Sequence, residues 1–116
     1  MNVMSSSKNG QAARRSRKKG QEEATAAGAA AAEAFLKALA NQHRLLLLCS
    51  LIEGEAAVGD LAQRLRLSQP NVSQHLAKMR ALGLVAARRE GTTIYYRIGD
   101  AAVVPIVEAL YRKFCS

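Results

Sequence analysis

Residues 58–98 constrain the fold of this chain most strongly, because apolar residues recur there at helical spacing in two short segments separated by a corner. The first segment carries Val58, Leu61, Ala62 and Leu65. The second segment carries Val72, Leu76, Met79 and Leu82. This spacing predicts two short helices that meet at a tight corner around Leu67-Ser68, with each apolar stripe buried.

The ends and the outer face of the second segment are also informative. Ser68 is a favoured helix N-cap, proline fits the first turn of a helix at Gln69-Pro70, and Gly83 occupies the usual glycine position after a helix. The face opposite the apolar stripe carries Pro70, Asn71, Gln74, Ala77 and Lys78, with Ser73 at its edge. Short amides and hydroxyls with one cation suit a helix that enters the major groove of DNA.

A hairpin pattern follows this helix pair directly. Residues 84–89 and 92–98 are strand-like, with Glu90-Gly91 predicted as the turn between them. Its cations, Arg88, Arg89 and Arg97, suit a wing that follows the phosphate backbone or enters the minor groove. An ordinary hairpin with a solvated charged face is the alternative, but the combination with the helix pair favours DNA binding.

We therefore expect two kinds of DNA contact. Contacts with base edges or adjacent phosphates are predicted for the start of the second helix, at Ser68, Gln69, Asn71, Ser73 and Gln74. Contacts with phosphates are predicted for Lys78, Arg88, Arg89, Thr92 and Arg97. Replacing a residue of the first group should change sequence preference, whereas replacing one of the second should weaken binding to all sequences.

The net charge of +8 is unevenly distributed along the 116 residues. Six of the seventeen cationic residues and none of the nine acids lie in residues 1–21, so the rest of the chain carries only +2. Residues 1–21 lack an apolar pattern and are predicted to form a disordered basic tail. They have no apolar core of a secretory signal, and no apolar run suffices to cross a membrane, so we expect a cytoplasmic protein.

Residues 22–116 are predicted to form one domain that dimerises, because a domain this small with long apolar helices often completes its core with a second copy. Only 4% of the chain is aromatic and it has no Trp, so an aliphatic core is expected. An alanine-rich helix is expected over 22–40. After an N-cap at Asn41, a second helix that is apolar almost all round over 45–52 is expected to be buried. A last helix should begin near Val103, with Pro105 in its first turn. Its apolar stripe is Val103, Val107, Leu110 and Phe114.

The resulting order is α-α-α-α-β-β-α: a mainly α fold with a β-hairpin wing. With the phrases at 38–45, ALANQHRL, and at 68–76, SQPNVSQHL, it resembles the ArsR-type winged helix-turn-helix repressors over residues 30–116. The resemblance implies a homodimer, joined through the first and last helices, that binds a pseudo-palindromic operator in double-stranded DNA. It also implies that an inducer releases the DNA.

The metal sites of that family are not matched by this sequence. Residues 55–61 hold no Cys-x-Cys motif, and the last helix offers Asp100 and Glu108 but no histidine. His43 and His75 are interpreted as hydrogen-bonding residues at the edge of the core. We therefore expect no metal site and no cofactor, although an incomplete arsenical site of two thiols stays open.

The two cysteines match another part of the family. Cys49 lies on the second helix and Cys115 near the end of the last, as in the sulfide- and persulfide-responsive, biofilm-growth-associated subgroup. The resemblance implies that both are regulatory thiols, which reactive sulfur species join through a disulfide or polysulfide bridge. Since a direct disulfide needs Cα atoms within about 7 Å, a wider pair would select persulfides over peroxide.

Three alternatives follow from the same residues. In the first, the chain is an ArsR-type repressor that responds to a metal, a metalloid or another ligand, and its cysteines form no redox switch. In the second, it keeps the winged fold but binds a partner other than DNA. An enzyme is the third and least supported class, because the sequence predicts no catalytic constellation of nucleophile, base and orienting group.

Overall fold

The computed structural model describes residues 19–115, with side chains from Glu22 onward. The chain divides into two compact units, one up to Ala34 and the other from Phe35 onward. The first unit contributes the N-terminal part of helix α2 (Lys19–Leu39), whose described side chains are all exposed. The helix begins three residues before the predicted start at Glu22, and residues 1–18 of the predicted basic tail lie outside the described residues.

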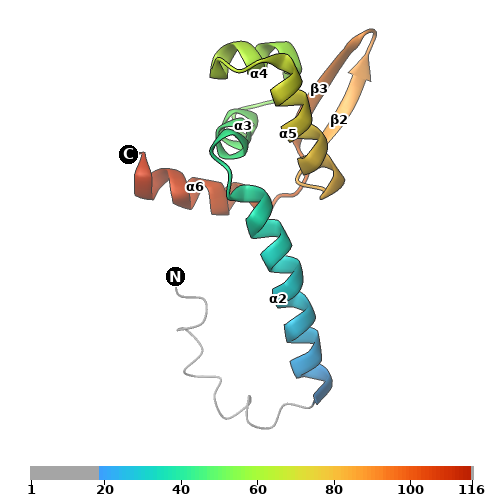
Figure 1. The fold of residues 1–116 in the computed structure, drawn as a ribbon, viewed down its shortest axis with the longest axis vertical. Helices are drawn as coiled ribbons and strands as arrows, with labels where there is room; N and C mark the ends of the chain where they lie inside the picture. Colours follow the sequence, from blue (N-terminus) through green and yellow to red (C-terminus); the bar gives the residue numbers. More distant parts are fainter. Residues whose placement is uncertain (1–18, 116) are drawn as a thin grey trace. The chain divides into compact units, whose positions relative to one another are not determined.

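The second unit contains the end of α2 and all the remaining elements (Figure 1). In chain order these are α3 (Gln42–Ile52), β1 (Ala56–Ala57), α4 (Val58–Leu65), α5 (Gln69–Ala81), β2 (Val85–Glu90), β3 (Thr93–Ile98) and α6 (Val103–Phe114). The structure confirms the predicted mainly α winged helix-turn-helix and its order of elements. It adds β1, a two-residue strand that sequence analysis missed.

Local capping signals define the helices as predicted. The Asn41 side-chain oxygen accepts a hydrogen bond from the Arg44 amide at 3.1 Å and caps α3. Gly83 has a φ of +78°, which favours glycine. Its amide and that of Leu84 donate to the carbonyls of Arg80 and Met79, both at 2.9 Å. This pattern of two bonds ends α5 with a Schellman motif.

The sheet is antiparallel with strand order β1-β3-β2. Glu90 pairs with Thr93, so the turn of the hairpin consists of Gly91 and Thr92. The predicted turn at Glu90-Gly91 was therefore one residue too early, and Thr92 belongs to the tip rather than to a strand. The tip of the β2–β3 hairpin projects away from the helices of its unit (Figure 1).

The core lies between α3, α4, α5, α6 and the sheet. Its fully buried larger side chains are Leu47, Leu48, Leu61, Val72, Leu76, Met79, Leu84, Val103 and Val107. The predicted stripe of α5 is confirmed at Val72, Leu76 and Met79. It is wrong at Leu82, which follows the helix and is 51% exposed. The prediction that α3 is buried all round is also wrong, because Leu46 is exposed.

The last helix begins at Val103, as predicted, with Pro105 in its first turn. The Asp100 carboxylate accepts a hydrogen bond from the Ala102 amide at 2.9 Å just before the helix. Val103 and Val107 are buried, but Leu110 and Phe114 are exposed, so only the first half of the predicted stripe is covered within the chain. No helix in the described part of the chain combines the length and apolarity that crossing a membrane requires.

Candidate nucleic-acid interface and thiol pair

The corner between α4 and α5 sets the direction of α5. Arg66 ends α4 in a left-handed conformation (φ 57°), and the Leu67 amide donates to the Ala62 carbonyl at 3.0 Å. The Ser68 hydroxyl then accepts a hydrogen bond from the Asn71 amide at 3.2 Å and caps α5. With Pro70 in the first turn, α5 starts within a few residues of the end of α4.

Four side chains on α5 that are predicted to reach base edges are exposed: Gln69, Asn71, Ser73 and Gln74. Lys78, a predicted phosphate contact on the same helix, is also exposed. Among the described residues, none of these five side chains forms a hydrogen bond or ion pair with another side chain, so their donors and acceptors face solvent. Gln69 lies against α4, where its amide nitrogen would be 3.5 Å from a Cβ atom added to Gly59.

The hairpin separates its cations onto two faces. Because paired residues share a face, Arg88 lies with Tyr95, and Arg97 with Ala86. Arg89 pairs with Ile94 on the other face, which also carries the buried Val85 and packs on the helices. Arg89 therefore lies on the side of the hairpin that faces the helices, and all three arginines and Thr92 are exposed.

Arg88 has partners within the chain. Its guanidinium donates to both carboxylate oxygens of Glu55, at 2.8 and 2.9 Å, contacts Glu90 at 3.3 Å and lies 4.6 Å from the centre of the Tyr95 ring. The hydrogen bond to Arg88 lowers the pKa of Glu55, and the same contact raises the pKa of Arg88. A DNA phosphate would have to compete with two carboxylates for the Arg88 guanidinium. Among the described residues, no carboxylate pairs with Arg89 in this way.

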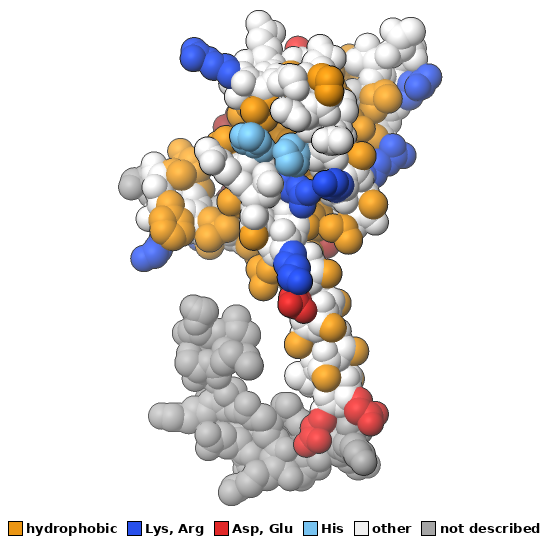
Figure 2. All heavy atoms as spheres, viewed as in Figure 1, with side chains coloured by type: hydrophobic (Ala, Val, Ile, Leu, Met, Phe, Trp, Pro, Cys, Tyr) orange, Lys and Arg blue, Asp and Glu red, His pale blue; other side chains and the backbone are white. Residues whose placement is uncertain are grey.

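The two histidines lie side by side in the second unit (Figure 2). Their ring centres are 5.7 Å apart in an edge-to-face arrangement, and His75 Nδ1 accepts a hydrogen bond from Arg44 Nε at 3.2 Å. Burial, followed by the charges of Arg44, His43 and Lys78, lowers the pKa of His75. The interpretation of His75 as a hydrogen-bonding residue at the edge of the core is confirmed.

No group of three or more His, Cys, Asp or Glu residues that could hold a metal ion occurs within the described range.

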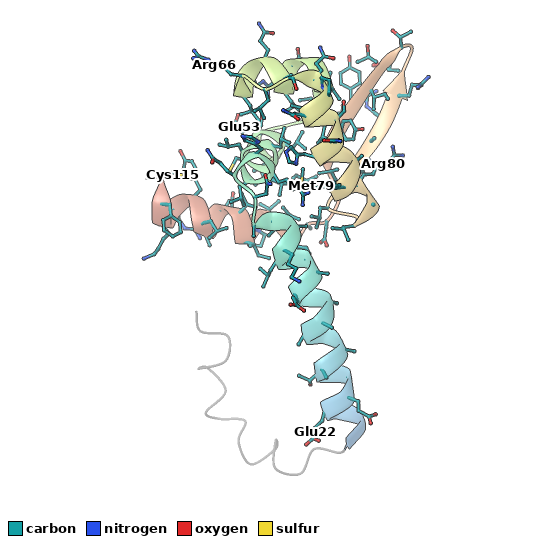
Figure 3. All side chains as sticks on the ribbon, in the orientation of Figure 1. Glu22, Glu53, Arg66, Met79, Arg80 and Cys115 are labelled. Atoms are coloured by element: carbon teal, nitrogen blue, oxygen red, sulfur yellow. The ribbon has the colours of Figure 1, made fainter. Side chains whose placement is uncertain are left out.

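The two thiols line one pocket between α3 and α6. Cys49 is half-buried on α3, and Cys115 is exposed at the end of α6 (Figure 3). The pocket has a volume of about 510 Å³, and its walls are largely apolar side chains, including Leu45, Leu110 and Phe114. Both thiols are free. The structure thus brings together the two cysteines that lie 66 positions apart in the sequence.

Cys49 also borders a second, more polar pocket of about 400 Å³, which Glu53, Glu108 and Arg112 line. Burial raises the pKa of the Cys49 thiol, and the nearby Cys115 and Glu53 raise it further. A raised pKa keeps Cys49 in its thiol form, which is the weaker nucleophile. The exposed Cys115 is therefore the more accessible of the two sulfurs for a first reaction.

Sequence analysis missed three residues of these sites, Glu55, Arg44 and Tyr95. Glu55 and Arg88 are 33 positions apart, and Arg44 and His75 are 31 apart. Neither pair has a local spacing that identifies it. The pairing of Tyr95 with Arg88 follows only from the hairpin register, which the predicted turn placed one residue too early.

Comparisons with known proteins agree with this architecture. The sequence profile of the family described as "Bacterial regulatory protein, arsR family" matches residues 41–87. The transcriptional activator HlyU of Vibrio cholerae is 45% identical over 85 residues, which are 73% of this chain and 79% of the relative. The biofilm growth-associated repressor of Xylella fastidiosa is 43% identical over 81 residues, 70% of this chain and 71% of the relative.

A solved structure gives the same comparison in three dimensions. The homodimeric winged helix-turn-helix DNA-binding domain of a possible ArsR-family regulator from Mycobacterium bovis superposes with a TM-score of 0.71. It is 36% identical, and the match covers 80% of this chain and 86% of that one.

Proposed function

Because this chain belongs to the bacterial regulatory proteins of the arsR family, we propose that it is a homodimeric repressor that binds a pseudo-palindromic operator. Modification of Cys49 and Cys115 by reactive sulfur species lowers the affinity of the dimer for that operator. The observation that carries this proposal is the shared pocket, which contains both thiols on two helices that pack against each other.

In this proposal, α5 enters the major groove. Its first residues reach base edges through Gln69, Asn71, Ser73 and Gln74, while Lys78 and the Ser68 end of the helix lie near phosphates. The support is the exposed, uncharged polar face, whose side chains have no competing hydrogen bonds within the described residues. A helix without bulky or acidic side chains on its outer face can approach the bases closely.

The hairpin acts as a wing. Arg89 and Arg97 supply phosphate contacts, and Thr92 at the tip adds a hydroxyl. Arg88, which the sequence pattern grouped with them, is assigned a different role, because Glu55 and Glu90 already bind its guanidinium. It ties the middle of β2 to Glu55, the residue that precedes β1.

A second copy of the chain covers the apolar surface on α6. Leu110 and Phe114 are exposed on this helix, and apolar residues of this size favour burial. The relative from Mycobacterium bovis is described as homodimeric, which supports the same assembly for this chain. A two-fold axis places the two α5 helices in successive major grooves.

The thiol chemistry proceeds by sulfur transfer. The Cys115 thiolate attacks the sulfane sulfur of an organic persulfide, RSSH. The S–S bond of the persulfide breaks, RS⁻ leaves as a thiol, and Cys115 carries one added sulfur. A second transfer adds another. The Cys49 thiolate then attacks the sulfur bonded to the Cys115 Sγ and expels HS⁻, which leaves a trisulfide between the two cysteines.

The test is an electrophoretic mobility-shift titration with DNA from the promoter of the chain's own gene. Reduced, polysulfide-treated, peroxide-treated and zinc-treated protein are compared, with Cys49→Ser and Cys115→Ser alongside. We expect polysulfide to release DNA from the wild type but not from either variant. Release of both variants by zinc would instead support a metal-responsive regulator in which the thiols are passengers.

A further inference from the structure

Helix α3, which carries Cys49, has a side-chain hydrogen bond to each helix of the helix-turn-helix. Arg44 Nε donates to His75 Nδ1 on α5 at 3.2 Å, in a partly buried position. Arg64 Nη1 on α4 donates to Ser50 Oγ at 2.9 Å, in an exposed position. A displacement of α3 therefore strains one bond to each of the two helices that position the candidate DNA-reading face.

Arg44 has the larger set of partners. Its Nη1 donates to the Ala38 carbonyl at 3.3 Å, at the end of α2, and its own amide is capped by the Asn41 side chain at 3.1 Å. The guanidinium thus bridges the end of α2, the start of α3 and the middle of α5. A planar guanidinium offers several donors in a fixed geometry, which holds these three elements at a defined spacing.

We propose that the Arg44–His75 hydrogen bond transmits the state of the thiols to the DNA-reading helix, with both residues acting as positioning residues. This inference rests on the thiol switch proposed above. Joining Cys49 to Cys115 draws α3 toward α6, and the bond to His75 either moves α5 with it or breaks. In both cases the face of α5 loses the orientation that it has in the free-thiol state.

The arrangement favours transmission through this bond over transmission through the apolar contacts alone. Arg44 and Cys49 are five residues apart on one helix, a rise of about 7.5 Å, so they move together. The apolar packing of the core, which includes Leu48 and Leu76, is non-directional, whereas a hydrogen bond at 3.2 Å is near the end of its useful range. A shift of a few tenths of an ångström weakens the hydrogen bond far more than the apolar packing.

His75 must remain neutral for this role, because Nδ1 accepts the bond from Arg44. Its surroundings favour that state: Arg44 and His43 face it from α3, Lys78 lies one turn further along α5, and the ring is partly buried. The Ser50–Arg64 bond lacks such protection from solvent, and an exposed bond contributes little. It therefore provides the matched control, one residue away from Cys49.

The test measures the dissociation constant for the promoter duplex before and after treatment with sodium tetrasulfide, in the full-length chain. Intact mass confirms that all variants form the same bridge. We expect His75→Leu to reduce the ratio of the two constants by about fivefold or more, relative to the wild type. His75→Asn, whose amide oxygen can replace Nδ1 as the acceptor, and Ser50→Ala should keep the wild-type ratio.

If His75 had only a structural role, replacing it would weaken DNA binding equally in both thiol states and leave the ratio unchanged. An unchanged ratio in His75→Leu would therefore overturn the proposal. If that variant fails to fold, Arg44→Lys decides by the same criterion, because an ammonium keeps the charge but cannot bridge the carbonyl and the imidazole together. A wild-type ratio near one would contradict the thiol switch itself. Failure of the switch is thereby distinguished from failure of the Arg44–His75 bond to transmit it.

Discussion

The reading unit (α4, α5 and the β2–β3 hairpin, residues 58–98) and the sensor helices (α3 and α6) differ in how much of their apolar surface the described chain buries. The reading unit buries Val72, Leu76 and Met79 fully and exposes a polar face. The sensor helices leave Leu46, Leu110 and Phe114 exposed around a pocket that contains both thiols. The apolar side chains of α5 are thus covered within the chain, whereas the sensor helices leave apolar side chains and the thiol pocket accessible.

The largest expected effect concerns the packing of the reading unit. Leu76→Ala should lower the free energy of unfolding by about 2–5 kcal/mol, because it removes a fully buried side chain and leaves a cavity. Leu82→Ala, at an exposed position just after the helix, is the control and should change stability by about 0.5 kcal/mol or less. Urea unfolding measures both, and equal losses would contradict the burial assigned to α5.

The next largest effect is expected on dimerisation, if the sensor helices form the dimer interface. Phe114 is 73% exposed, so Phe114→Ser should hardly change the packing of the single chain. It should raise the dimer dissociation constant by about tenfold or more if a second copy buries this ring. Sedimentation velocity over a concentration series measures the constant, with the exposed Lys78→Ser on α5 as the control. An unchanged dimer constant would remove Phe114 from the interface.

A third comparison divides the reading unit itself. Gln74→Ala should cost about 1–3 kcal/mol of affinity for the promoter duplex and relax its sequence preference. Arg89→Ala should weaken binding to all sequences alike and reduce the slope of affinity against salt by about one. Arg88→Ala is the matched control on the same strand, and its salt slope should stay near that of the wild type, because Glu55 occupies the guanidinium.

If Arg88→Ala lowered the salt slope as much as Arg89→Ala, the ion pair with Glu55 would have to open when DNA binds. The sequence-based grouping of the two arginines would then be correct.

The smallest effect is a pH dependence. The pKa of His75 is lowered in the folded chain, so its contribution to stability is fully present above its unfolded value of about 6.5. The contribution is lost as the pH falls through the lower folded pKa. Unfolding free energies measured from pH 7.5 to 5 should therefore decline less in His75→Asn than in the wild type. Parallel profiles would show that His75 does not titrate with folding.

The contrast between the two regions also explains which features the sequence predicts. Ser68, Asn41 and Gly83 act within a few residues of their own positions, so the ends of α3 and α5 follow from local rules. The exposure of Leu110 and Phe114 depends on what packs beside α6, which periodicity does not specify. The bonds of Arg88 and Arg44 join residues more than thirty positions apart, and β1 exists only because Ala56 and Ala57 pair with β3.

The central claim is that the reading unit binds DNA and the thiols of the sensor helices decide when it is released. Its most direct test is the dissociation constant for the promoter duplex in one wild-type sample, measured reduced, after sodium tetrasulfide and again after dithiothreitol. We expect the constant to rise at least fivefold on treatment and to recover fully on reduction, with no change in Cys49→Ser. An unchanged constant in the wild type, although mass spectrometry shows the bridge, would contradict it.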